Sequence, residues 1–149
     1  MDIILAIILS YLIGSISPSW FFGKLKGIDV REKGVKNVGA YNTIKLVGII
    51  PGVITGIFDI AKGVLAIFIA TNSTTSLFLV YLVGLAAIVG HNFPFHLRFK
   101  GGYGVAVAIG TIIGALIWNL SWILIILLFI TEIFFFVLRY RKNIRKRKK

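Results

Sequence analysis

The residues best suited to chemistry lie in one stretch, from Gly90 to Ala106. Glycine lets successive backbone N–H groups turn toward one point, and a nearby lysine adds positive charge. This combination predicts a nest for an anion. The alternative is a tight turn with a lysine on the cytoplasmic side of a membrane. The side chains and glycines concerned are His91, Lys100, Gly101, Gly102 and Gly104.

A second polar group lies upstream, in the stretch from Lys24 to Lys45. Asn37 and Asn42 flank Gly39 and Ala40, a pattern typical of a turn whose side chains can form hydrogen bonds. The stretch is long enough for a short helix at the membrane surface.

Two ionisable residues, Asp59 and Lys62, interrupt an apolar segment. At a spacing of three residues they share one face of a helix and can pair. Charged groups at bilayer depth normally face a polar cavity or each other, so the pair either lines a site or serves packing alone. His91 has the same ambiguity, between a site role and a helix-end histidine bonded to backbone.

The elements that must position these residues are membrane helices. The chain has 149 residues, of which 58% are hydrophobic, and a mean hydropathy of +0.94, so its solvent is lipid. We expect an all-α, polytopic membrane helix bundle over residues 1–138, with Pro18 kinking or ending the first helix, and a basic tail over 139–149. The expected spans are about 3–23, 46–70, 77–95, 104–118 and 122–138.

The charges predict the orientation. The net charge is +12, but the cations outside the spans lie only in 24–45, 98–100 and the tail. This favours anionic membrane lipids over nucleic acid as partners. With five spans in a cell membrane, the N-terminus is outside and the C-terminus is cytoplasmic. The chain has no cysteine and only scattered acidic residues, so neither a metal nor a cofactor is expected.

Several blocks of this sequence resemble a bacterial membrane acyltransferase family. That family moves a fatty acyl group from acyl-phosphate to glycerol-3-phosphate, which gives lysophosphatidic acid for phospholipid synthesis. The resemblance implies the same two substrates here. The blocks that carry it are 11–16, 23–31, 37–42, 59–63, 90–106 and 139–144.

The departures from the family pattern fall on positions expected to be catalytic. The serine, the glycine-loop lysine and the C-terminal histidine of the family are replaced by Val35, Tyr103 and Tyr140, and its arginine by Lys45. A lysine lacks the bidentate fork of arginine, and loss of one electrostatic group commonly costs about a hundredfold in rate. Family members are also longer, with a serine-bearing loop before the last helices that has no counterpart here.

We therefore assign no catalytic residue with the sequence alone. The expected phosphate-binding residues are Asn37, Asn42, Lys45, Lys100, Gly101, Gly102, Gly104 and Asn143, with Lys36, Asp59, Lys62 and His91 as further candidates. The sequence supports an acyltransferase of this family with impaired activity. The alternative is a non-catalytic relative that binds an anion or lipid or serves as a partner subunit.

Overall fold

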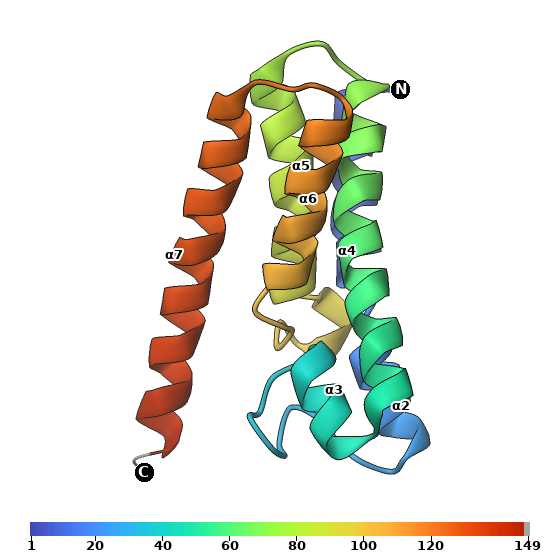
Figure 1. The fold of residues 1–149 in the computed structure, drawn as a ribbon, viewed down its shortest axis with the longest axis vertical. Coiled ribbons are helices and arrows are strands. Elements are labelled where there is room, and N and C mark those ends of the chain that lie inside the picture. Colours follow the sequence, from blue (N-terminus) through green and yellow to red (C-terminus); the bar gives the residue numbers. More distant parts are fainter. Residues whose placement is uncertain (148–149) are drawn as a thin grey trace.

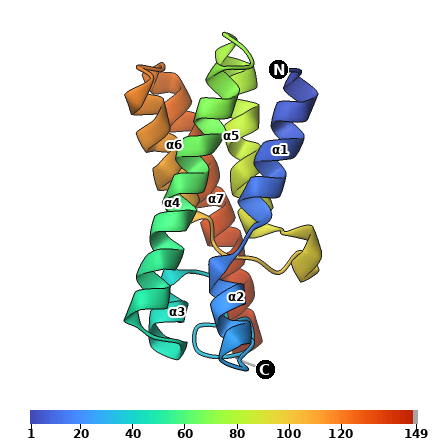
Figure 2. The ribbon, with the colours of Figure 1, turned by 90° about the vertical axis from the view of Figure 1, so that its right-hand side faces the viewer.

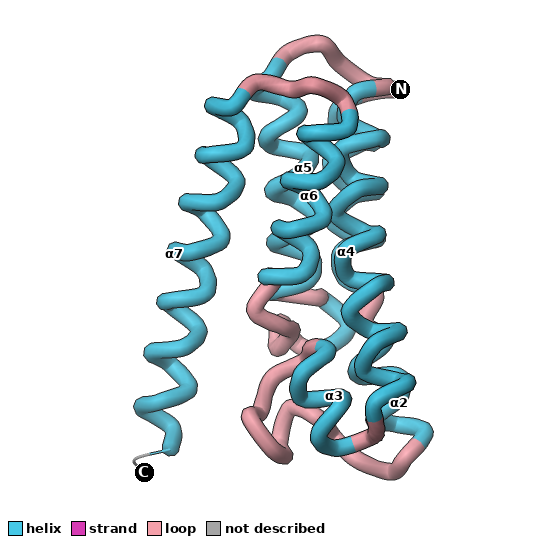
Figure 3. Tube along the Cα trace, in the orientation of Figure 1, coloured by secondary structure: helices cyan, strands magenta, loops and turns pink. Residues whose placement is uncertain are grey.

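The computed structural model of the protein describes residues 1–147, and within its last helix the side chains of residues 122, 124, 139 and 142–147 lie outside the description. The described chain is all helical, as predicted (Figure 1, Figure 3). Its helices are α1 (Ile3–Ser15), α2 (Pro18–Leu25), α3 (Ala40–Leu46), α4 (Ile49–Thr71), α5 (Leu77–Asn92), the 3₁₀ helix η1 (Phe95–Leu97), α6 (Val105–Ile117) and α7 (Trp122–Arg147).

The predicted break at Pro18 is confirmed. Pro18 is the first residue of α2, where its missing N–H costs nothing. The side chain of Ser17 caps the helix by accepting a hydrogen bond from the Trp20 N–H at 3.2 Å. The first apolar segment is therefore two helices joined at residues 16–17.

Among the residues that the structure describes, three helical segments are long and apolar enough to cross a membrane: 3–25, 49–71 and 77–97. α6 has 13 residues and does not borrow from residues 99–104, which form a loop. Two boundaries differ from expectation. The second span begins at Ile49, because residues 40–46 form the separate helix α3, and α7 continues through the basic segment to Arg147.

Glycines allow two close helix crossings. A Cβ on Gly63 of α4 would overlap the carbonyl oxygen of Val107 in α6, and one on Gly110 would overlap that of Ile60. A Cβ on Gly90 of α5 would overlap the carbonyl oxygen of Tyr11 in α1. Small residues permit this backbone approach in membrane bundles.

The polar segments gather at one end of the bundle. α2, α3 and the loops on either side of α3 lie at the end where the C-terminus emerges, while the N-terminus and the turns around residues 73 and 119 lie at the other (Figure 1, Figure 2). α7 packs along one side, against α5 and α6. The fold thus brings three polar segments that are distant in sequence to the same end.

Candidate functional site

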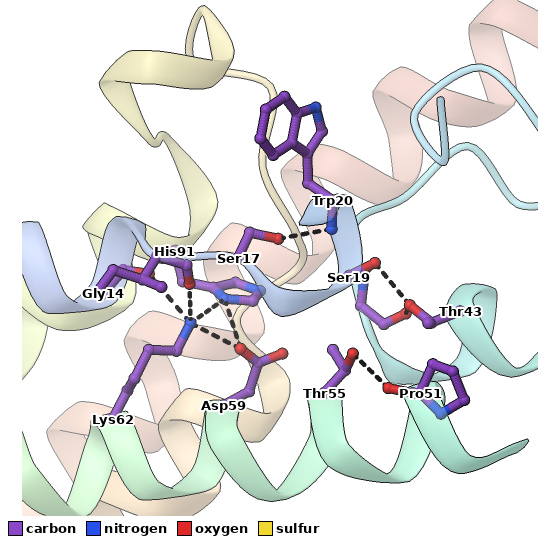
Figure 4. Close-up of polar contacts among 12 residues, drawn as sticks. Gly14, Ser17, Ser19, Trp20, Thr43, Pro51, Thr55, Asp59, Lys62 and His91 are labelled. Atoms are coloured by element: carbon purple, nitrogen blue, oxygen red, sulfur yellow. Dashed lines mark hydrogen bonds and ion pairs between the residues drawn. The ribbon is translucent and has the colours of Figure 1, made fainter. Parts of the chain in front are cut away.

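A buried charged cluster lies where α4, α5 and the α1–α2 break meet. The Lys62 Nζ lies 2.7 Å from the Asp59 Oδ1, and both side chains are at most 3% exposed. The His91 Nδ1 lies 3.3 Å from Nζ and 3.5 Å from the same carboxylate oxygen (Figure 4). His91 is therefore held by an ion pair, an arrangement that neither sequence interpretation contained.

Lys62 also closes the end of α1. Its ammonium donates to the carbonyl oxygens of Gly14 at 3.2 Å and Ile16 at 2.7 Å. The last carbonyl groups of a helix have no partner within it, and a cation there is favourable. The cluster thus fixes the break between α1 and α2 relative to α4.

The glycine-rich loop lies directly on this cluster. The N–H groups of Gly101 and Gly102 donate to the carbonyl oxygens of Asn92 and His91, at 3.2 and 3.1 Å. The predicted anion nest is therefore wrong for these two glycines, because their donors already hold the loop against the end of α5. Gly104 adopts a left-handed conformation, with φ of 88°, immediately before α6.

The cluster and the loop border a cavity of about 260 Å³, here named the motif pocket. It adjoins the first turn of α6, which begins directly after Gly104. No lysine or arginine in the described part of the chain borders it. Its walls include Asn37, Gly39, Asp59, His91, Tyr103 and Gly104. Asp59 and Lys62 thus pair with each other, as expected if they serve packing. Asp59 also borders a cavity, as expected if the pair lines a site.

Asn42 orders the loop beside this pocket. Its Nδ2 donates to the carbonyl oxygens of Val30 at 2.7 Å and Asn37 at 2.9 Å, while its Oδ1 accepts from the Val35 N–H at 3.0 Å. Its side chain is only 1% exposed. Asn42 is therefore not open to a phosphate, contrary to the prediction.

Lys45 lines neither of the two cavities at this end of the molecule, the motif pocket and the basic pocket described next. It is exposed on α3, and its Nζ lies 4.6 Å from the centre of the Tyr41 ring. The predicted gathering of Asn37, Lys45 and the glycines thus holds for Asn37 and Gly104 alone.

A larger cavity of about 620 Å³, here named the basic pocket, lies beside the same loop. Arg31 is fixed in its wall by the Asp29 carboxylate at 2.6 Å and the Leu97 carbonyl oxygen at 3.0 Å. The hydrogen bond from Arg31 lowers the pKa of Asp29. The other charged or polar lining side chains are Trp20, Glu32, Lys36, His96, Arg98 and Lys100. Lys36 and Lys100 therefore line the same cavity, and their role in phosphate binding stays a prediction.

Two of the substituted family positions meet on one aromatic stack. The ring of Tyr103 contacts Phe136 edge-on at 5.3 Å, and Phe136 stacks on Tyr140 at 5.8 Å with 9° between the planes. Aromatic pairs of this kind contribute about 0.5–1.5 kcal/mol beyond their buried area. The third substituted residue, Val35, offers only its backbone, and the side chain of Asn143 lies outside the described residues.

Two buried polar residues near the site escaped the sequence interpretation. Glu132 of α7 is 6% exposed, and its carboxylate lies near Gly104, where an added Cβ would be 2.9 Å from Oε2. A lone acid in an apolar span was the available signal. Ser19 accepts from the Gly39 N–H at 3.1 Å and lies 2.7 Å from the Thr43 hydroxyl (Figure 4), a contact that no sequence pattern marks.

Comparison with known proteins agrees with this architecture. A model of the glycerol-3-phosphate acyltransferase family matches residues 4–146. The chain belongs to this family. Glycerol-3-phosphate acyltransferase of Thermotoga petrophila is 42% identical over 127 residues, which cover 81% of this chain and 65% of the relative. Glycerol-3-phosphate acyltransferase 2 of Moorella thermoacetica is 41% identical over 130 residues, 83% of this chain and 66% of the relative.

The acyltransferase fold is also seen among solved structures. The glycerol 3-phosphate form of PlsY (YgiH), an integral membrane glycerol 3-phosphate acyltransferase, superposes with a TM-score of 0.76 at 25% identity, covering 97% of this chain and 90% of the other. The chain spans less than two thirds of the length of the curated relatives above. The predicted family and helical membrane fold are confirmed.

Proposed function

We propose that this protein transfers an acyl group from acyl-phosphate to glycerol-3-phosphate, giving lysophosphatidic acid at the cytoplasmic face of the cell membrane. The acceptor hydroxyl oxygen bonds to the acyl carbon, the bond from that carbon to the phosphate oxygen breaks, and phosphate leaves. The hydroxyl proton leaves with the phosphate or with solvent. The relatives are named glycerol-3-phosphate acyltransferases, which supports glycerol-3-phosphate as the acceptor.

The observation that carries the proposal is the meeting of separate motifs around the 31–39 loop. This loop borders both cavities: Lys36 lines the basic pocket, and Asn37 lines the motif pocket. Lys36 and Lys100 supply positive charge for phosphate oxygens. Asn37 and the first turn of α6 supply donors for an acyl oxygen that gains charge.

We expect slow turnover. The Val35 side chain cannot donate a hydrogen bond, and the Tyr103 and Tyr140 hydroxyls bring no positive charge. Each such loss is worth about 10²–10³ in rate. A second function, binding without turnover, is favoured by the Tyr103–Phe136–Tyr140 stack, because it holds aromatic rings where the family has cations.

Growth rescue separates the two functions. The gene is expressed in cells depleted of their own acyltransferase, with membrane insertion verified by immunoblot. Restored growth supports turnover, and absence of growth with inserted protein supports the binding function. A catalytically intact relative expressed at the same level is the positive control.

A triple variant tests the cause of slow turnover. Val35→Ser, Tyr103→Lys and Tyr140→His together should raise acyl transfer in membranes by at least tenfold if side-chain chemistry is what limits the rate. The single change Lys33→Gln, at an exposed position that borders neither pocket, is the matched control. A triple variant that inserts but gains no activity contradicts the side-chain explanation.

A further inference from the structure

We propose that His91 is a positioning residue for acyl transfer. Lys62 fixes the tautomer of its imidazole ring, and the Nε2–H of that tautomer holds the glycine-rich loop and the 31–39 loop together. Which nitrogen of a neutral histidine carries the proton is set by the hydrogen bond that the other nitrogen makes. The inference rests on the proposed function only for the reaction that the two loops serve.

The Nδ1 edge of the ring faces an ammonium group. The Lys62 Nζ lies 3.3 Å from Nδ1, whereas the Asp59 Oδ1, at 3.5 Å, is beyond the usual range of an N–H···O hydrogen bond. An ammonium can only donate, so a proton on Nδ1 would set two donors against each other. Nδ1 is therefore the acceptor, and the proton of the neutral ring lies on Nε2.

The three hydrogens of the Lys62 ammonium agree with this tautomer. Its two contacts of 2.7 Å, to the Asp59 Oδ1 and the Ile16 carbonyl oxygen, use two of them. The third is shared between the Gly14 carbonyl oxygen at 3.2 Å and the His91 Nδ1 at 3.3 Å (Figure 4). Each of these four partners must be an acceptor, because the ammonium has no lone pair.

The opposite edge of the ring lies on both loops. A Cβ on Gly102 would overlap the His91 Nε2 and also the Val38 carbonyl oxygen, so these two atoms lie beside the same glycine. A bare ring nitrogen and a carbonyl oxygen are both acceptors, so Val38 suits an Nε2 that carries a proton. The tautomer that Lys62 favours is thus the one that the Val38 carbonyl oxygen favours as well.

This arrangement places groups of the two loops around the motif pocket. Asn37 and Val38 of one loop and Tyr103 of the other line it together with His91. The Gly102 N–H also donates to the His91 carbonyl oxygen at 3.1 Å. The backbone and the ring of His91 therefore hold the glycine-rich loop from two sides. His91 acts on the reaction through the position of Asn37, the donor proposed for the acyl oxygen.

Nitrogen NMR of the imidazole ring reads the tautomer directly. The full chain, with isotope-labelled histidine, is studied in phosphatidylcholine nanodiscs at pH 7. The chain has two histidines, so a His96→Gln variant identifies which signals belong to His91. We expect a protonated Nε2 and an unprotonated Nδ1. A proton on Nδ1 alone, or protons on both nitrogens, overturns the inference.

Two substitutions separate the two edges of the ring. Glutamine can place its amide N–H near the position of Nε2, whereas asparagine reaches only as far as Nδ1 and keeps an acceptor for Lys62. His91→Asn should speed amide hydrogen exchange in both 36–39 and 99–104 by about tenfold, because one buried hydrogen bond is lost. His91→Gln, and the exposed control Thr75→Ala at the other end of the bundle, should stay near the parent. Equal exchange in the two His91 variants overturns the inference.

Acyl-transfer kinetics, normalised to folded protein, show whether the contact serves the reaction. His91→Asn should lower kcat about tenfold and leave the KM for glycerol-3-phosphate nearly unchanged, because the basic pocket is intact. His91→Gln should restore most of kcat. An equal fall in kcat in both variants, or a change in KM alone, overturns the positioning role. A parent without turnover contradicts the proposed function, whereas the tautomer and the exchange rates still decide this inference. If His91→Asn does not insert, the spectrum of the parent and the exchange of His91→Gln decide it.

Discussion

Lys62 shows how one side chain can join a structural and a functional role. It neutralises Asp59, which borders the motif pocket, and it bonds the carbonyl oxygens that end α1. A buried ion pair contributes little net stability, but removal of one partner leaves an uncompensated charge that is costly. Replacing one member of the pair should therefore destabilise the protein, whereas replacing both with uncharged residues should cost much less.

Lys62→Met should lower the stability of the protein by about 3–5 kcal/mol, because Asp59 would stay buried with only His91 beside it and the carbonyl groups that end α1 would lose their donor. Asp59→Asn combined with Lys62→Met should recover part of that loss. Thermal unfolding in detergent measures both. Lys33→Met, at an exposed position, should stay within about 0.5 kcal/mol of the parent. A single variant as stable as Lys33→Met would show that the charge is not buried.

Asp29 and Arg31 give the polar end a dependence on pH. The pKa of Asp29 is lowered in the folded chain, so its contribution is fully present above the unfolded pKa of about 3.9 and is lost as the pH falls through the lower folded value. Asp29→Asn should therefore cost about 0.5–1 kcal/mol at pH 7, and the difference from the parent should vanish near the folded pKa. Unfolding midpoints of both proteins from pH 7 to pH 3 provide the measurement. A difference that does not change with pH would contradict the ion pair.

At the scale of elements, glycine contacts decide how closely the helices approach. Gly63→Ala would place a methyl group on the carbonyl oxygen of Val107 and should destabilise the α4–α6 crossing by about 1–3 kcal/mol. Gly56→Ala is the matched control on the same helix, since its Cβ would lie 3.4 Å from Ala40 Cβ. The control should be neutral or slightly stabilising. Unfolding in detergent compares them, and equal stability of the two variants would contradict close packing at Gly63.

Some of these elements could be predicted from the sequence, and some of the contacts between them could not. The break before Pro18, a short helix in the polar stretch before the second span and the apolar helices follow from local chemistry, so they were predictable from residue types. The roles of Asn42, Gly101 and Gly102 were not. Their hydrogen-bonding groups are used by backbone groups brought close only by the tertiary fold, namely those of Val30, Asn92 and His91. A residue type indicates which hydrogen bonds a group can form, whereas the fold decides whether its partner is another part of the protein or a ligand.

At the scale of the whole molecule, the positive charge at one end predicts the orientation in the membrane. We expect the loops around residues 33 and 99 inside the cell, and the turns at 71–76 and 118–122 outside. The chain has no cysteine, so a single introduced cysteine is the only labelling site for a maleimide. Thr75→Cys should react with an impermeant maleimide in intact cells, and Lys33→Cys only after permeabilisation. Labelling in the reverse order would contradict the orientation.

The bonds that Lys62 makes to α1 also bear on biosynthesis. Because α1 is synthesised before α4, we expect the carbonyl groups of Gly14 and Ile16 to be in place when the Lys62 ammonium arrives. Asp59, three residues earlier on the same helix, enters with it as a neutral pair. We expect α4 to insert with this pair already formed, so that His91 of α5 later joins two charges that balance each other.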